Sequence, residues 1–225
     1  MRIFATADLH GDRRKMHLLS DASETVDMVL VCGDIGGYSG TWPHGISQAQ
    51  EEDVKYLDGI LSSLPCPGYY ILGNDDWTEY TGPGRLLSPV VQDSYQFVPF
   101  EFVSTTPFQT NREVNDHRIF YELTRLTAGP DTVMVAHTPP YRAGDRVRNG
   151  ERVGSYSLHR WLLESKPALW LCGHIHEDPC TVLVGSTLVC NCSTGASPSN
   201  ELRGYIIELL PKGGPIVEPV QYRTN

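Results

Sequence analysis

The chain has 225 residues, of which 40% are hydrophobic and 20% are charged, as in ordinary globular proteins. It carries 18 basic and 27 acidic residues, and the net charge of −9 argues against a basic surface for nucleic acid or for an anionic membrane. No apolar run is long enough to span a bilayer, and six cysteines are too few for a disulfide scaffold. We therefore expect a cytoplasmic protein with reduced thiols.

Short apolar runs alternate with helical patterns through the first two thirds of the chain, which indicates an α/β protein. In chain order we predict strand Ile3–Ala7, helix Arg13–Glu24, strand Val26–Cys32, helix Ile46–Leu64, strand Tyr69–Leu72, helix Arg112–Leu126, strand Val133–Ala136, helix Leu158–Leu163 and strand Ala168–Cys172. Ser47 and Gln50 have the spacing of a capping box, which predicts that the second helix begins slightly after Ile46. Residues 90–110 have no clean period and are predicted to mix irregular strand and loop.

The last third of the chain is rich in predicted strands. Thr181–Val184 and Leu188–Cys192 flank Gly185-Ser186-Thr187, which predicts a hairpin. Tyr205–Leu210 and Ile216–Val220 are two further strands. Because no linker or repeat interrupts the sequence, residues 1–225 are predicted to form one domain.

Polar residues follow all five strands of the first two thirds. The carboxyl ends of such strands meet where open α/β sheets bind ligands, so these side chains are expected to converge. Asp8 with His10, and His174 with His176, are two positions apart, and an extended backbone points each pair in one direction. The full set is Asp8, His10, Asp34, Asn74, His137, His174 and His176.

These three carboxylate or amide groups and four imidazoles suit divalent first-row metals. Any one of them alone would more often be a turn or core residue, and the ordered arrangement is what favours a metal site. Seven side chains are too many for one ion and suit two ions that share a carboxylate. We predict two divalent transition-metal ions, manganese first, with iron, zinc or nickel as alternatives.

The five blocks resemble the signature of the calcineurin-like metallophosphoesterases, which reads D-x-H, G-D-x-x-G, G-N-H-[DE], H and G-H-x-H, from Asp8 to His176. This resemblance implies a four-layer α/β/β/α sandwich with two mixed sheets, whose second sheet would take up the strand-rich last third. It implies one ion held by Asp8, His10, Asp34 and His176, and another held by Asp34, Asn74, His137 and His174. Asp34 would then bridge the two ions.

Asp75 departs from this signature, because the family has a histidine at its position. That histidine would assist the leaving group, and members that lack it look more like phosphodiesterases than efficient monoesterases. An aspartate could donate a proton only with a pKa well above its usual value of about 4, and nearby metal charge acts in the opposite direction. Asp75 is therefore either a catalytic group or a residue of the turn.

We predict a dinuclear-metal phosphoesterase that hydrolyses small phosphate esters, diesters above all, by attack of a metal-bridging hydroxide. The alternatives are a phosphomonoesterase of the same fold and a non-catalytic metal-binding scaffold. The acidic charge disfavours nucleic acid as a partner but is compatible with a nucleotide substrate. The predicted catalytic residues are Asp34, Asn74, His137 and Asp75.

Substrate binding is predicted for Asn74, His137 and Arg142. Arg142 is the first of four arginines in the loop after His137, and arginine forks suit phosphate oxygens. Asp12 and Asp76 are equally consistent with a supporting role behind the ligands and with ordinary surface acids. The remaining histidines, away from strand ends, are left outside the site: His17, His44, His117 and His159.

Overall fold

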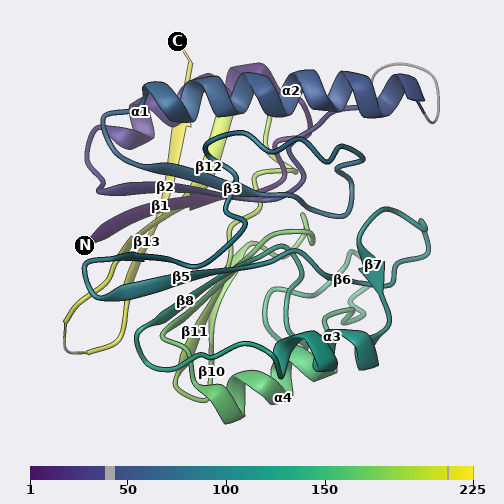
Figure 1. Ribbon diagram of the computed structural model, residues 1–225, viewed down its shortest axis with the longest axis vertical. Coiled ribbons are helices and arrows are strands. Elements are labelled where there is room, and N and C mark those ends of the chain that lie inside the picture. Colours follow the sequence, from purple (N-terminus) through teal and green to yellow (C-terminus); the bar gives the residue numbers. More distant parts are fainter. Residues whose placement is uncertain (39–43, 212, 225) are drawn as a thin grey trace.

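The computed structural model describes residues 1–38, 44–211 and 213–224, and these form four layers (Figure 1). Two helices cover one sheet, a second sheet packs beneath the first, and two further helices cover the second sheet. The helices are α1 (Arg13–Ser23), α2 (His44–Ser63), α3 (Asp116–Leu123) and α4 (Tyr156–Ser165). Among the described residues, no helix is both long and apolar enough to cross a membrane.

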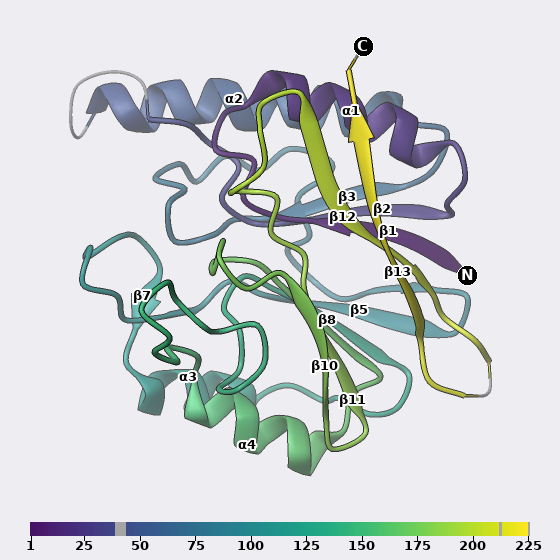
Figure 2. The same ribbon diagram turned by 180° about the vertical axis from the view of Figure 1, so that it is seen from behind.

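Both sheets mix parallel and antiparallel strands, as Figure 2 shows from behind. The first sheet has the order β13 (Ile216–Arg223), β12 (Glu201–Glu208), β1 (Arg2–Thr6), β2 (Met28–Cys32) and β3 (Gly68–Ile71). The second has the order β10 (Cys180–Val184), β11 (Thr187–Asn191), β9 (Leu169–Cys172), β8 (Thr132–Ala136), β5 (Tyr95–Phe100) and β4 (Val90–Gln92). A small pair, β6 (Val103–Ser104) and β7 (Glu113–Val114), lies beside it. The predicted α/β/β/α sandwich with two mixed sheets is confirmed.

The central strands are apolar throughout because both of their faces are buried. In β1, Ile3 points toward the second sheet and packs in the same cluster as Phe97 of β5. Phe4, the next residue, points the opposite way and packs with Met16 of α1 and Leu57 of α2. Each such side chain contributes about 1.5–3 kcal/mol on burial, which holds the two sheets and their helices together.

All five strands predicted for the first two thirds are confirmed within two residues, and so is the hairpin, which β10 and β11 form. Helices α1 and α4 begin where capping residues allow. The Asp12 carboxylate accepts hydrogen bonds from the backbone N–H groups of Arg14 and Lys15. The Ser155 hydroxyl accepts one from Leu158. Side-chain oxygens at these positions satisfy N–H groups that the helix itself leaves unpaired.

Two helix predictions are wrong in their boundaries. The segment predicted as helix Arg112–Leu126 begins as strand β7, and α3 starts only at Asp116, behind the cap Asn115. The second helix already begins at His44, so Ser47 and Gln50 form no capping box. Their side chains instead donate to the carbonyls of Trp77 and Asp75, at 3.0 and 2.7 Å, because this turn packs against α2.

Candidate metal centre

The seven predicted ligands lie at one edge of the molecule, where strands of both sheets end. Asp8 and His10 follow β1, Asp34 follows β2, Asn74 follows β3, His137 follows β8, and His174 and His176 follow β9. Three groups have possible ligand atoms within 4.8 Å of one another: Asp8, His10 and His176; Asp8, Asp34 and His137; His10, Asp34 and Asp75. The fold therefore brings together residues that the sequence separates by up to 168 positions.

Left-handed backbone conformations shape these turns. The φ angles are 64° at Asp8, 47° at His10, 54° at Asp34 and 71° at His174. Such conformations cost of order 1–3 kcal/mol each for residues other than glycine, and they concentrate at functional sites. Backbone bonds hold the first two turns together, since Asp8 donates to the carbonyl of Gly33 and His10 to that of Asp34, each at 3.0 Å.

His137 is fully buried and fixed in orientation. Its Nδ1–H donates to the carbonyl of Cys32 at 2.7 Å, which directs Nε2 to within 3.2 Å of Asp34 Oδ2. A side chain on Gly33 would approach Nδ1 to 2.6 Å, so only glycine fits beneath the ring. Burial alone would lower the pKa of His137, but the charge of Asp34 raises it to about 10. Burial likewise opposes ionisation of Asp34, yet the charge of His137 holds the pKa of that carboxyl below its usual range.

Asp8 connects the two histidines that follow β9. Its carboxylate accepts from the backbone N–H of His174 at 3.1 Å and lies 3.5 Å from Nε2 of His176. Burial acts to raise the pKa of Asp8, but the bond from His176 and the charge of His137 lower it overall. The Nε2 atoms of His10 and His176 are 3.1 Å apart, so these two rings aim at one point. Burial, with the charge of His137, lowers the pKa of His174 to about 4, which favours the neutral ring, in which one nitrogen has a lone pair for a cation.

Two buried polar atoms at this edge have no hydrogen-bond partner among the described residues: Asn74 Oδ1 and His137 Nε2. The Asn74 amide donates its N–H to Thr110 at 2.6 Å, which turns Oδ1 toward the site. An unpaired buried polar atom such as Asn74 Oδ1 costs about 1–3 kcal/mol, whereas His137 Nε2 still faces Asp34 Oδ2 at 3.2 Å. Both are atoms that divalent metals bind. The donor set therefore fits divalent cations.

Of the two aspartates that the sequence left open, only Asp76 supports the site. Its carboxylate accepts from the backbone N–H groups of Ile35, Gly36 and Gly73, at 2.9, 2.8 and 2.8 Å. It thereby joins the turn that carries Asp34 to the turn that carries Asn74. Burial and the charge of Asp34 raise the pKa of Asp76 to about 6. Asp12 caps α1 instead.

Asp75 faces the same edge. Its Oδ2 lies 3.6 Å from Nδ1 of His10, its Oδ1 accepts from the Tyr38 hydroxyl, and its backbone N–H donates to Asp34 at 2.8 Å. Burial raises the pKa of the Asp75 carboxyl. The residue is thus within reach of a group bound between His10 and Asp34, as well as part of the turn.

A cavity of about 530 Å³ opens over these residues. Five of the residues that line it were not predicted from the sequence: Tyr38, Trp77, Phe108, Gln109 and Thr110. Three of them come from the loop between β6 and β7, which has no periodic or motif signal. Arg142 is exposed, with its guanidinium over the ring of Tyr141 at 5.3 Å, and it is not among the described residues that line this cavity. Its contact with substrate stays a prediction.

The histidines left outside the site lie elsewhere. His17 on α1 is 2.5 Å from the Tyr56 hydroxyl of α2, and His117 and His159 lie on α3 and α4. The side chain of His44 falls outside the described part of the chain.

Comparison with known proteins decides the family. The model for calcineurin-like phosphoesterases matches residues 1–178. The chain belongs to the calcineurin-like phosphoesterase family. An uncharacterized protein of Methanocaldococcus jannaschii, MJ1162, is 25% identical over 203 residues, which cover 85% of this chain and 87% of that protein.

Two solved structures are similar to this phosphoesterase in fold. TT1561 of Thermus thermophilus superposes with a TM-score of 0.69 at 16% identity, covering 97% of both chains. NAD nucleotidase of Haemophilus influenzae (NadN) gives 0.51 at 10% identity, covering 99% of this chain and 50% of that one. At these identities the likeness concerns the fold alone.

Proposed function

We propose that this phosphoesterase is a dinuclear-metal enzyme that hydrolyses small phosphate esters, and diesters in preference to monoesters. The observation that carries the proposal is the convergence of carboxylates and imidazoles from several strand ends, together with the buried Asn74 Oδ1, which has no hydrogen-bond partner among the described residues. A buried amide oxygen normally has such a partner, so this atom is available to bind a cation.

The proposed ligands divide into two sets with one member in common. Asp8, His10, Asp34 and His176 would hold one ion, and Asp34, Asn74, His137 and His174 would hold the other. Support for the shared role of Asp34 comes from its Oδ2, which lies 3.2 Å from His137 and 4.0 Å from His10, one from each set. Two divalent ions, manganese in the first place, would supply Lewis acidity to phosphoryl oxygens and lower the pKa of a water molecule toward neutrality.

Residues behind the ligands prepare them for this role. The Cys32 carbonyl fixes the tautomer of His137, and Thr110 fixes the amide orientation of Asn74. The backbone N–H of Asp75 donates to Oδ1 of Asp34, which leaves Oδ2 to face His137 and His10. Such outer contacts typically change metal affinity or activity by about 10- to 100-fold when they are lost.

The preference for diesters follows from Asp75. Divalent charge nearby favours its ionised form, and a carboxylate on the cavity wall opposes a dianionic monoester more than a monoanionic diester. It also provides no proton for a poor leaving group, so diesters with activated leaving groups should react fastest.

The test is removal and restoration of metal. After dialysis against a chelator and reloading with Mn²⁺, we expect about two ions per chain and a higher kcat/KM for an aryl phosphodiester than for the matched monoester. Circular dichroism should keep its far-UV signal throughout, because the fold rests on its apolar cores. Absence of metal uptake would point to a scaffold, and preference for the monoester would point to a phosphatase.

A further inference from the structure

A second groove, of about 610 Å³, adjoins the metal cavity. Three residues line both spaces: Phe108, His174 and His176. We propose that this groove binds the second ester group of a phosphodiester, and that this group is uncharged and aromatic. The inference rests on the proposed phosphodiesterase function and names the class of substrate.

The connection between the two spaces gives the phosphoryl position two exits. A phosphate held near His174 and His176 can extend one substituent past Tyr38 and Trp77 in the cavity and the other into the groove. A monoester has one organic group and would fill only one exit. A diester fills both, which makes the second groove a recognition site that only diesters use fully.

Phe108 lines both spaces, its side chain is 81% exposed, and the loop backbone on either side of it is hydrogen-bonded to one carboxylate. The Glu113 carboxylate accepts from the backbone N–H of Thr106 at 2.9 Å and from its hydroxyl at 2.5 Å. It also accepts from the backbone N–H of Thr110 at 2.9 Å. One carboxylate thus fixes the loop backbone on both sides of Phe108, so little backbone conformational entropy is lost when a ligand contacts this residue.

Two valines add apolar surface to this groove, beside the polar Arg148, Asn149 and Glu151. Val147 and Val153 line the groove, and Val153 is 44% exposed. Val147 donates its N–H to the carbonyl of Glu151, and Val153 donates to that of Asp145, each at 3.0 Å. A flat ring between Phe108 and these valines would bury apolar surface on both of its faces.

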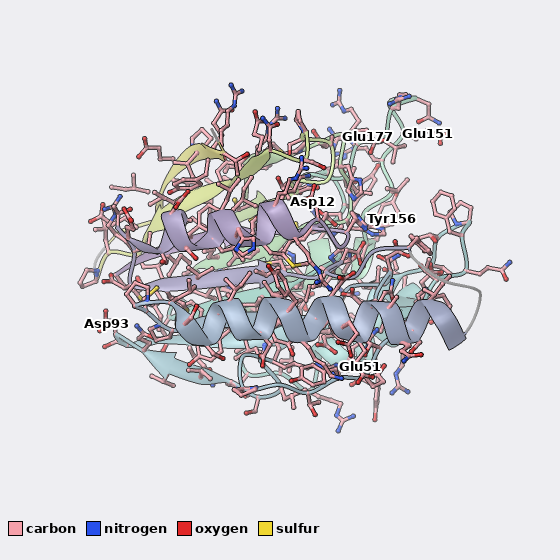
Figure 3. All side chains as sticks on the ribbon, turned by 90° about the horizontal axis from the view of Figure 1, so that it is seen from above. Asp12, Glu51, Asp93, Glu151, Tyr156 and Glu177 are labelled. Carbon is pink, nitrogen blue, oxygen red and sulfur yellow. The ribbon has the colours of Figure 1, made fainter. Side chains whose placement is uncertain are left out.

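The charges of the groove disfavour a second phosphate. Two carboxylates, Glu151 and Glu177, line it against one guanidinium, Arg148, and the two glutamates project on the same side of the molecule (Figure 3). A polynucleotide, or any substrate with a second phosphate next to the first, would place negative charge against these carboxylates. An uncharged aromatic ester group meets no such repulsion.

The test compares two diesters with the same leaving group, phenyl 4-nitrophenyl phosphate and methyl 4-nitrophenyl phosphate, on the manganese-loaded protein. An aromatic contact of this kind is worth about 3- to 10-fold in affinity, so KM for the phenyl ester should be lower by that factor. In Val153→Asp and Phe108→Ala the advantage should disappear, read as the ratio of the KM values for the two esters in each variant. Leu183→Ala, on the exposed face of β10, is the matched control and should keep the advantage.

Two outcomes would overturn the proposal. If the phenyl ester keeps its lower KM in both Val153→Asp and Phe108→Ala, the phenyl ring binds elsewhere. If these variants raise KM equally for both esters, the groove binds the shared leaving group instead. Saturation-transfer NMR of diphenyl phosphate on the zinc-loaded protein separates this from the proposed function. If the phenyl contacts vanish in Val153→Asp and neither ester is hydrolysed by the wild type, the groove binds aromatic groups but the proposed phosphodiesterase function is wrong.

Discussion

The edge that carries the proposed metal ligands, here the ligand edge, and the loops that wall its two cavities are held in place by different means. At the ligand edge, left-handed turns directly follow buried strands and are joined by backbone bonds, such as that from His10 to the Asp34 carbonyl, with the Asp76 carboxylate bonded behind them. In the walls, one carboxylate in each loop accepts several bonds. Glu113 fixes the loop around Phe108, and the fully buried Asp145 accepts from Arg142 N, Gly154 N and Arg152 Nη1 at 2.9, 3.1 and 2.7 Å.

This difference separates chemistry from specificity. The ligand turns are inseparable from the sheets, so they cannot change without disturbing the fold. Each wall loop is fixed by one carboxylate, that of Glu113 or Asp145, so the sequence of the loop can change while the sheets stay intact. Substitutions in the two regions should therefore differ in kind: ligand-edge changes should abolish metal binding and turnover, and wall changes should alter KM.

The largest effect is expected for Asp34→Asn. Asparagine keeps the size of the side chain but removes the negative charge that faces both His137 and His10. Activity should fall by more than the roughly 100-fold that loss of an outer contact costs. Metal content after dialysis against metal-free buffer should fall further than in Asp8→Asn, because a bridging ligand serves two ions. A fully loaded and active Asp34→Asn protein would remove Asp34 from the bridging position.

A smaller loss of metal affinity is expected for Asp76→Asn, because Asp76 bonds the backbone of the ligand turns and is not itself a proposed ligand. The amide cannot accept all three backbone bonds that the carboxylate accepts, so the Asp34 and Asn74 turns should loosen. We expect metal affinity to fall by about 10- to 100-fold, measured by titration with Mn²⁺. Asp12→Asn is the control, since asparagine also caps helices and that site lies at α1. Equal loss in both variants would show a general destabilisation.

The ligand edge was predictable from the sequence because its signal is local. A strand buried on both faces must be an apolar run, and a ligand at its carboxyl end must follow within a few residues, as Asp34 follows β2 and His137 follows β8. Even so, the sequence could not separate Asp12 from Asp76, because each is an aspartate near a strand end. Only Asp76 meets N–H groups from two different turns.

The walls were not predictable because their contacts, although only three to nine positions apart, join irregular segments and run against the local pattern. The helical spacing of apolar residues extends back to Arg112. However, the Glu113 carboxylate accepts hydrogen bonds from the hydroxyls and N–H groups of Thr106 and Thr110, and α3 starts only after it. Gln50 resembles half of a capping box, yet its amide bonds the Asp75 carbonyl of a turn 25 positions away. No local pattern carries that information.

Asp75 belongs to both regions, since it follows β3 with the ligands but faces the cavity with the walls. The variant Asp75→His tests which role dominates. A protonated histidine beside the leaving oxygen can donate a proton as the ester bond breaks, and such assistance typically contributes 10²–10⁴-fold in a fully adapted site, as a rough range. This site is not adapted to histidine, because the Tyr38 hydroxyl is positioned to donate to a carboxylate. We therefore expect a more modest rise, about 10-fold, in monoesterase relative to diesterase activity.

The control Asp75→Asn separates proton donation from charge. Asparagine removes the negative charge that opposes a dianionic monoester but supplies no acid, so it should raise the ratio of kcat/KM values less than histidine does, and through KM alone. The measurement is that ratio for matched aryl monoester and diester in wild type and both variants, at equal metal content. Equal ratios in the two variants would assign the effect of Asp75 to its charge. A ratio unchanged from wild type in both would place Asp75 away from the leaving group, and the preference for diesters would then depend on the walls, with Phe108 and Val153 as the residues to vary.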